Sequence, residues 1–210
     1  MKTSAALRET FADIDIYLFD QLLKGRFDTR QRVLDAGCGD GRNLHYLLRA
    51  GFDCFAIDED ARAIDQVRRR AAQLAPALPS SQFVVGDLVA LPWDAASMDA
   101  VICSAVLHFS HDAEHFGRML TEMWRVLTPG GLFFARVASN IGLERVLGDR
   151  AGRRMRLPDG SSRFVVDEPM LLEWTDRLGG ELIDPIKTTN VQQQRCMTTW
   201  CLTKPANAGV

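Results

Sequence analysis

Several sequence features that would mark particular classes of protein are absent from these 210 residues. The 25 basic and 27 acidic residues leave a net charge of only -2, so no excess of positive charge favours binding to nucleic acid or to an anionic membrane. No apolar run reaches membrane-spanning length, and acidic residues interrupt the apolar positions of the N-terminus, unlike a signal peptide. We therefore expect a cytoplasmic protein that binds neither nucleic acid nor membranes.

The sequence also lacks the spacings typical of metal and disulfide sites. His111 and His115 are four residues apart on a predicted helix, but HDAEH is not HExxH and no third ligand is evident, so we expect no metal. No CxxC pair occurs, and most cysteines lie in apolar runs, which predicts reduced, buried thiols. The cysteines are Cys38, Cys54, Cys103, Cys196 and Cys201.

Internal repeats, low-complexity tracts and linkers are missing as well, and this favours one domain. Within it, short apolar runs alternate with amphipathic segments, which predicts a parallel sheet with helices on both faces and ligands at the carboxyl ends of the strands. Apolar residues at helical spacing from Leu7 to Leu23 predict one or two N-terminal helices. The expected strands are 32–36, 53–57, 82–85, 100–104 and 132–137, the expected helices are 42–50, 61–74, 111–127 and 170–178, and strands at 181–188 and 196–203 would form a closing hairpin.

What the sequence does have is VLDAGCGDGRN, residues 33–43, with three glycines in five residues directly behind the first predicted strand. Glycines between a strand and a helix permit a sharp turn and let a ligand approach the main-chain N–H groups. The NAD and FAD fingerprint GxGxxG would need glycine where Arg42 stands, and no lysine follows Gly41 as a P-loop requires. The loop therefore predicts a cofactor site of another kind.

The segment Asp35-Ala-Gly37-Cys38-Gly39-Asp40-Gly41 resembles motif I of the class I S-adenosylmethionine-dependent methyltransferases. Three further matches follow in register: Asp58 at the end of the second strand, Gly86-Asp87-Leu88 after the third, and LTPGG at 127–131 before the fifth. A weaker similarity to the small-molecule branch, including tellurite-resistance-type methyltransferases, rests on the short chain and on the segments NLHYLL and VICSAVLHF.

The resemblance implies a Rossmann-like, seven-stranded, mostly parallel sheet with an antiparallel last strand and helices on both faces. Residues 1–25 would form an N-terminal helical cap, 30–137 the cofactor-binding core, and 138–205 a C-terminal segment on the substrate side. The implied reaction moves the methyl group of S-adenosylmethionine to a small-molecule acceptor by SN2 displacement and releases S-adenosylhomocysteine. Alignment of the reactants suffices for such a reaction, so it requires no catalytic side chain. Two alternatives stay open: a nucleotide-dependent oxidoreductase and a non-catalytic S-adenosylmethionine-binding protein.

The resemblance also implies which residues hold the cofactor. Residues of the glycine loop would hold the methionine end through their main chain or from behind the contacting groups, and an aspartate would bind the ribose. The turn after the third strand would contact adenine, and the end of the fourth strand would form the floor. These residues are Asp35, Gly37, Cys38, Gly39, Arg42 and Asn43 at the methionine end, Asp58 at the ribose, Gly86, Asp87 and Leu88 at the adenine, and Ser104 at the floor, and Glu59 is a further cofactor-binding candidate.

Candidates for the acceptor site follow from placement along the chain. Arg136 lies at the carboxyl end of the fifth strand, while Lys187 and Arg195 bracket the turn between the last two strands, which predicts one pocket for an anionic acceptor. A surface salt-bridge network explains the same cations. Tyr17 is a candidate lid residue, and His108, just beyond the fourth strand, is the candidate acid or base. The acceptor atom, the choice between monomer and homodimer, and the role of the arginine-rich segment 145–163 stay open.

Overall fold

Short apolar strands in the first two thirds of the chain pair in parallel to form the centre of a sheet. The computed structural model describes residues 3–147 and 152–206. The sheet order is β3-β2-β1-β4-β5-β10-β8, so the order reverses between β1 and its neighbour β4, where open α/β sheets bind ligands. The parallel strands are β1 (Arg32–Ala36), β2 (Asp53–Asp58), β3 (Phe83–Val85), β4 (Met98–Ser104) and β5 (Leu127–Ser139).

The C-terminal strands run antiparallel to this core. β10 (Arg195–Thr203) pairs with β5 along most of its length, and its other edge pairs with β8 (Glu181–Leu182) at one end and β9 (Lys187–Val191) at the other. A separate two-stranded sheet, the hairpin of β6 (Arg154–Arg156) and β7 (Ser162–Phe164), lies outside the main sheet.

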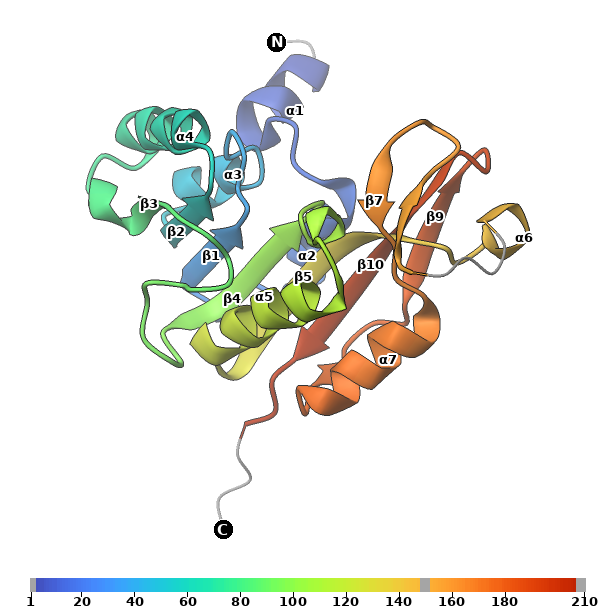
Figure 1. Cartoon of the computed structure of the whole chain (residues 1–210). Helices are drawn as coiled ribbons and strands as arrows, with labels where there is room; N and C mark the ends of the chain where they lie inside the picture. Colours follow the sequence, from blue (N-terminus) through green and yellow to red (C-terminus); the bar gives the residue numbers. More distant parts are fainter. Residues whose placement is uncertain (1–2, 148–151, 207–210) are drawn as a thin grey trace.

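Helices cover both faces of the sheet (Figure 1). α2 (Ile16–Leu23), α3 (Leu44–Arg49) and α4 (Ala61–Leu74) bury apolar side chains on one face, and α5 (Ala113–Val126) and α7 (Glu168–Arg177) do so on the other. α1 (Thr3–Phe11) contacts α3, with Phe11 stacked 5.1 Å from Tyr46. The short elements are η1 (Ser80–Gln82), η2 (Leu107–Phe109) and α6 (Glu144–Leu147). No helix within the described ranges is long and apolar enough to span a membrane.

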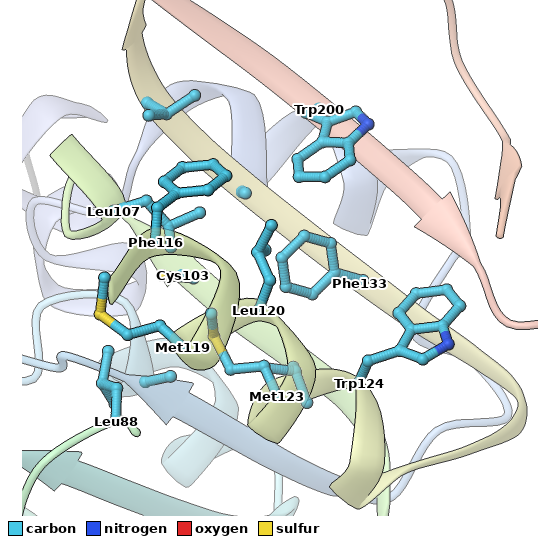
Figure 2. Packing of buried hydrophobic residues seen from close by; sticks show 14 of the residues in the cluster. Leu88, Cys103, Leu107, Phe116, Met119, Leu120, Met123, Trp124, Phe133 and Trp200 are labelled. Carbon is cyan, nitrogen blue, oxygen red and sulfur yellow. The ribbon is translucent and has the colours of Figure 1, made fainter. Parts of the chain in front are cut away.

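The core beneath α5 shows how helical spacing creates this packing (Figure 2). Apolar residues recur on one face of α5 and pack against large side chains of β5 and β10. Phe133 meets Trp200 edge to face at 5.6 Å and Trp124 at 6.3 Å. The helix contributes Phe116, Met119, Leu120, Met123 and Trp124.

The predicted fold class is confirmed, with corrections in the last third of the chain. The main sheet has eight strands instead of seven, because the run 181–188 is divided into β8 and β9. Pro185, which has no N–H to donate, stands in the gap between them. β5 begins five residues before the expected strand, at Leu127. Part of the arginine-rich segment is ordered as α6 and the β6–β7 hairpin, while Arg150 lies outside the described residues.

Replacing Trp200 by alanine should destabilise the fold, because its ring is fully buried and its Nε1 donates a 3.1 Å hydrogen bond to Thr175 Oγ1. We expect a loss of about 3–5 kcal/mol in the free energy of unfolding, measured by urea denaturation. Leu23→Ala, at a side chain that is 72% exposed, is the control and should change little. Equal effects of the two substitutions would contradict this description of the core.

Candidate active site

The carboxyl ends of the parallel strands open into a cavity of 440 Å³, here called the glycine-loop cavity. A volume of this size is typical of small-molecule sites. Every predicted cofactor residue except Asp35 lines it, so groups far apart in the sequence meet at one place. Its walls are Gly37, Cys38, Gly39, Asp40, Arg42, Asn43, Asp58, Glu59, Gly86, Asp87, Leu88, Ser104, Ala105, Val106, Phe109, His111, His115 and Met119.

Two glycines of the loop serve different purposes. Gly37 has φ +76°, and a Cβ there would lie 2.5 Å from Val106, so close packing of the protein itself requires glycine. Gly39 has φ +52°, yet a Cβ added there would meet no protein atom within 4 Å. Because Gly39 lines the cavity, this bare main chain faces open space that a ligand can occupy.

Asp58 shapes the loop from the end of β2. Its Oδ2 accepts a 2.8 Å hydrogen bond from the N–H of Gly39, and its Oδ1 accepts one of 3.0 Å from the N–H of Asp60. Asp87, after β3, accepts a 3.0 Å hydrogen bond from the N–H of Val89. Both aspartates therefore hold main-chain turns while lining the cavity.

Asp35 lies in β1, outside the cavity lining, and is 1% exposed. Neither of its carboxyl oxygens has a hydrogen-bond partner within the described parts of the chain. Burial raises the pKa of Asp35 to about 7, although the charge of Arg42 opposes the shift. Asp35 therefore lies behind the cavity wall, and its role in cofactor binding stays a prediction.

A second cavity of 610 Å³, here called the arginine cavity, adjoins the first and shares Arg42, Ala105 and Phe109 with it. Its walls come from the start of α2, from η2, from β5 and β10, and from the β6–β7 hairpin and its turn. They consist of Ile14, Asp15, Ile16, Arg42, Ala105, His108, Phe109, Arg136, Ala138, Leu157, Asp159, Ser161, Arg163, Arg195 and Met197.

Asp15 is a wall residue that the sequence analysis missed. It is the N-cap of α2, with Oδ1 accepting from the N–H of Tyr17 at 2.9 Å. Its buried Oδ2 accepts from Ser104 Oγ at 3.0 Å and from the guanidinium of Arg136 at 2.9 Å, and Arg42 lies 3.8 Å away. An aspartate before an apolar helical run indicates only a cap, so no sequence signal indicated these partners.

The structure brings together only some of the predicted acceptor residues. Arg136, Arg195 and His108 line the arginine cavity, whereas Tyr17 and Lys187 line neither cavity. The ring of Tyr17 instead lies 4.6 Å from the guanidinium of Arg136 and 5.9 Å from the ammonium of Lys187. The predicted convergence of three cations on one pocket is therefore wrong for Lys187.

His108 is 5% exposed, and its Nδ1 is buried with no hydrogen-bond partner among the residues described. Burial, reinforced by the charges of Arg163 and Arg195, lowers the pKa of His108 to about 4, so the ring is neutral at pH 7. Burial also raises the pKa of the Cys38 thiol, which argues against a nucleophilic thiolate.

His111 and His115 line the glycine-loop cavity with rings stacked 4.6 Å apart. The main-chain N–H of His111 donates to Nδ1 of His115 at 3.2 Å. Across residues 3–147 and 152–206, no group of three or more histidine, cysteine, aspartate or glutamate side chains is arranged to hold a metal ion.

Comparison with known proteins decides the family. Residues 33–131 match the family model described as a methyltransferase domain. An uncharacterized methyltransferase of Mycobacterium tuberculosis is 30% identical over 187 residues, which cover 84% of this chain and 68% of the relative. The chain belongs to the class I S-adenosylmethionine-dependent methyltransferases. The family prediction and the predicted methyl donor are thereby confirmed, and methyl transfer is favoured over the oxidoreductase alternative.

Solved structures share the fold of this methyltransferase. The PH0226 protein of Pyrococcus horikoshii is 20% identical, with a TM-score of 0.69 over 97% of this chain and 99% of that one. The 1,6-didemethyltoxoflavin-N1-methyltransferase of Burkholderia thailandensis is 21% identical, with a TM-score of 0.67 over 88% and 75% of the chains. That structure contains 1,6-didemethyltoxoflavin and S-adenosylhomocysteine.

The buried Asp35 of the methyltransferase should make stability depend on pH. Its folded pKa of about 7 lies above its ordinary value of 3.8, so its contribution is favourable below pH 4 and is lost as pH rises through 7. Between pH 5 and 8, the wild type should lose about 2 kcal/mol of unfolding free energy relative to Asp35→Asn. Urea denaturation at each pH measures this difference. Parallel pH profiles would contradict it, because the two proteins share every other titrating group.

Proposed function

We propose that this methyltransferase methylates a small, anionic acceptor bound in the arginine cavity. The observation that supports the proposal most directly is the contact between the two cavities, which share Arg42, Ala105 and Phe109. A cofactor in one cavity and an acceptor in the other would meet at this shared wall, which would hold the two reactants next to one another.

The glycine-loop cavity suits S-adenosylmethionine, which when bound supplies an electrophilic methyl group and departs as S-adenosylhomocysteine. Open space beside Gly39 supports a close approach of the methionine end to the main chain. We assign Asp58 and Glu59 to the ribose hydroxyls and the Gly86–Leu88 turn to adenine, because all of them line this cavity. Ser104, at the end of β4, forms the floor and is fixed there by Asp15.

The charge of the arginine cavity supports an anionic acceptor. Four arginines and two aspartates line it, which leaves two positive charges beside a neutral His108. Apolar side chains such as Leu157 and Met197 complete the wall and suit the body of a small organic molecule. The Burkholderia neighbour, crystallised with a small heterocycle, is consistent with a small-molecule acceptor.

His108 is the candidate side chain to receive a proton from the acceptor, although burial and the charges of Arg163 and Arg195 make its imidazole a weak base. Its ring is neutral at pH 7 and lines the arginine cavity, so an acceptor O–H or N–H that loses its proton during methylation can give it to the imidazole. Positioning of the reactants contributes more to the rate of methyl transfer than a base does. An acceptor that is already ionised needs no base.

All five cysteines are free and buried, as predicted. Free thiols persist in reducing compartments, and we accordingly propose the cytoplasm as the location of the enzyme.

The acceptor can be found by incubating the enzyme with methyl-labelled S-adenosylmethionine and a metabolite extract separated into anionic, neutral and cationic fractions. We expect release of S-adenosylhomocysteine and a labelled product from the anionic fraction, identified by mass. Cofactor binding without turnover in any fraction would favour the non-catalytic alternative. A labelled product from only the neutral or cationic fraction would contradict an anionic acceptor.

Gly39→Val should abolish cofactor binding, because the branched side chain would fill the open space beside the loop. Gly51→Val is a matched control: Gly51 also has positive φ, and a Cβ added there would meet no neighbour within 4 Å, but it lies outside both cavities. Titration calorimetry with S-adenosylhomocysteine should show binding only for the control. Tight binding to folded Gly39→Val would mean that the loop is purely structural.

Asp58→Ala should weaken S-adenosylhomocysteine binding by roughly 2–3 kcal/mol, because it removes charge-assisted hydrogen bonds to the ribose and releases the N–H of Gly39. Asp60→Ala removes a neighbouring exposed cap outside the cavity and should bind nearly as wild type does. Calorimetry on both variants tests the assignment, and unchanged affinity in the Asp58 variant would exclude it.

A further inference from the structure

We propose that Arg163 of β7 and Arg195 of β10 form a clamp for the anionic group of the acceptor, and that this group is a monoanionic carboxylate. The inference rests on the proposed function and assigns the substrate class of the same site. It replaces the sequence expectation that Arg136 and Lys187 bind the anion.

Arg136 is already paired within the protein. Its guanidinium lies 2.9 Å from the carboxylate of Asp15, and the two side chains are only 15% and 3% exposed. Arg42 also lies near this carboxylate, at 3.8 Å, and donates to the main-chain oxygen of Asp13 at 3.3 Å. The Asp15 carboxylate therefore offsets positive charge on this side of the cavity.

Arg163, unlike Arg136, is not paired with a carboxylate of the described chain. Within the described chain, its guanidinium donates to the main-chain oxygen of the adjacent Ser162, and no carboxylate lies within 4.0 Å of it. The guanidinium rests 4.8 Å from the ring of Phe109, which belongs to the wall shared by the two cavities. An anion bound here would lie close to the cofactor side.

Arg195 approaches from another strand. Its contact with Asp159 is long, at 3.9 Å, and its side chain is 56% exposed. Hydrogen bonds from Ser161 lower the pKa of Asp159, and burial lowers the pKa of His108. The charges of Arg195 and Arg163 add to both shifts, and the two guanidiniums line the same cavity as the two groups that they affect. The cavity as a whole has two surplus positive charges, and one of them belongs to the set formed by Arg163, Arg195 and Asp159, which suits a monoanionic carboxylate.

The hairpin holds Arg163 firmly. Its turn is closed by a 2.8 Å hydrogen bond from the N–H of Leu157 to the oxygen of Ser161. Arg154 ties the hairpin to η2 by donating to the main-chain oxygen of Ser110 at 2.9 Å. These bonds fix the main chain of β7, and the Arg163 guanidinium is itself positioned by its contacts with Phe109 and with the main-chain oxygen of Ser162.

The test uses benzoate as the probe, benzamide as its neutral match and phenyl phosphate as the dianion. Ligand-detected NMR at pH 7.5 measures binding to the wild type and to Arg163→Gln, Arg195→Gln and Arg156→Gln. Arg156 is an exposed arginine on the same hairpin outside both cavities, so its variant is the matched control. Calorimetry with S-adenosylhomocysteine on the same samples reports the cofactor site separately.

We expect benzoate to bind the wild type and the control, and to bind each of the other two variants roughly tenfold more weakly or worse, as for loss of a charged hydrogen bond. Benzamide should not compete. The clamp is overturned if benzoate fails to bind an enzyme that binds S-adenosylhomocysteine normally, or if neither glutamine variant weakens it. Tighter binding of phenyl phosphate would overturn the carboxylate assignment. Absence of S-adenosylhomocysteine binding in the wild type would instead contradict the proposed function.

Discussion

The carboxylate of Asp15 holds together the parts of the molecule that make the site. One buried oxygen accepts hydrogen bonds from Ser104 at the end of β4 and from Arg136 in β5, and the other caps α2. The main-chain N–H of the same residue donates to Asn43 beside the glycine loop at 3.0 Å. A buried carboxylate is tolerated only when such partners offset the loss of hydration. The start of α2 is thereby fixed over the functional edge of the sheet, next to Arg42 of the wall that the two cavities share.

The cofactor side could be predicted because its determinants are local in the sequence. Each element ends a strand: the glycine loop follows β1, Asp58 closes β2 and Asp87 follows β3. Parallel strands bring their carboxyl ends to one edge, so a short motif after each strand is enough to place all of them in one cavity. The fold class followed from the same alternation of strands and helices. Asp35, which was expected to act through its main chain or from behind the residues that contact the cofactor, lies buried outside the cavity lining.

The acceptor side could not be predicted in the same way, because its walls depend on long-range pairing. Arg136 and Lys187 occupy matching positions across Thr199 of β10, and both lie against the ring of Tyr17, yet only Arg136 also lines the arginine cavity. Whether an arginine is available to a ligand depends on which carboxylate reaches it, and Asp15 is more than a hundred residues from Arg136 in sequence. The run 181–188, expected as one strand, is interrupted around Pro185, so Lys187 begins β9 instead of lying near the end of a longer strand.

The β6–β7 hairpin is structurally separate from the main sheet, which carries the cofactor loop. It forms a sheet of its own, and the chain that follows it meets the main sheet through the bridge between Ser139 and Val166. Its turn residues therefore take no part in the hydrogen-bond ladder that supports the cofactor loop. Residues such as Asp159 and Ser161 can be exchanged without altering strand register or the stacking of α5 on the sheet. If the acceptor binds where we propose, changes in a few residues of this turn would alter which acceptor is bound, while the strands and loops that hold the methyl donor keep their structure.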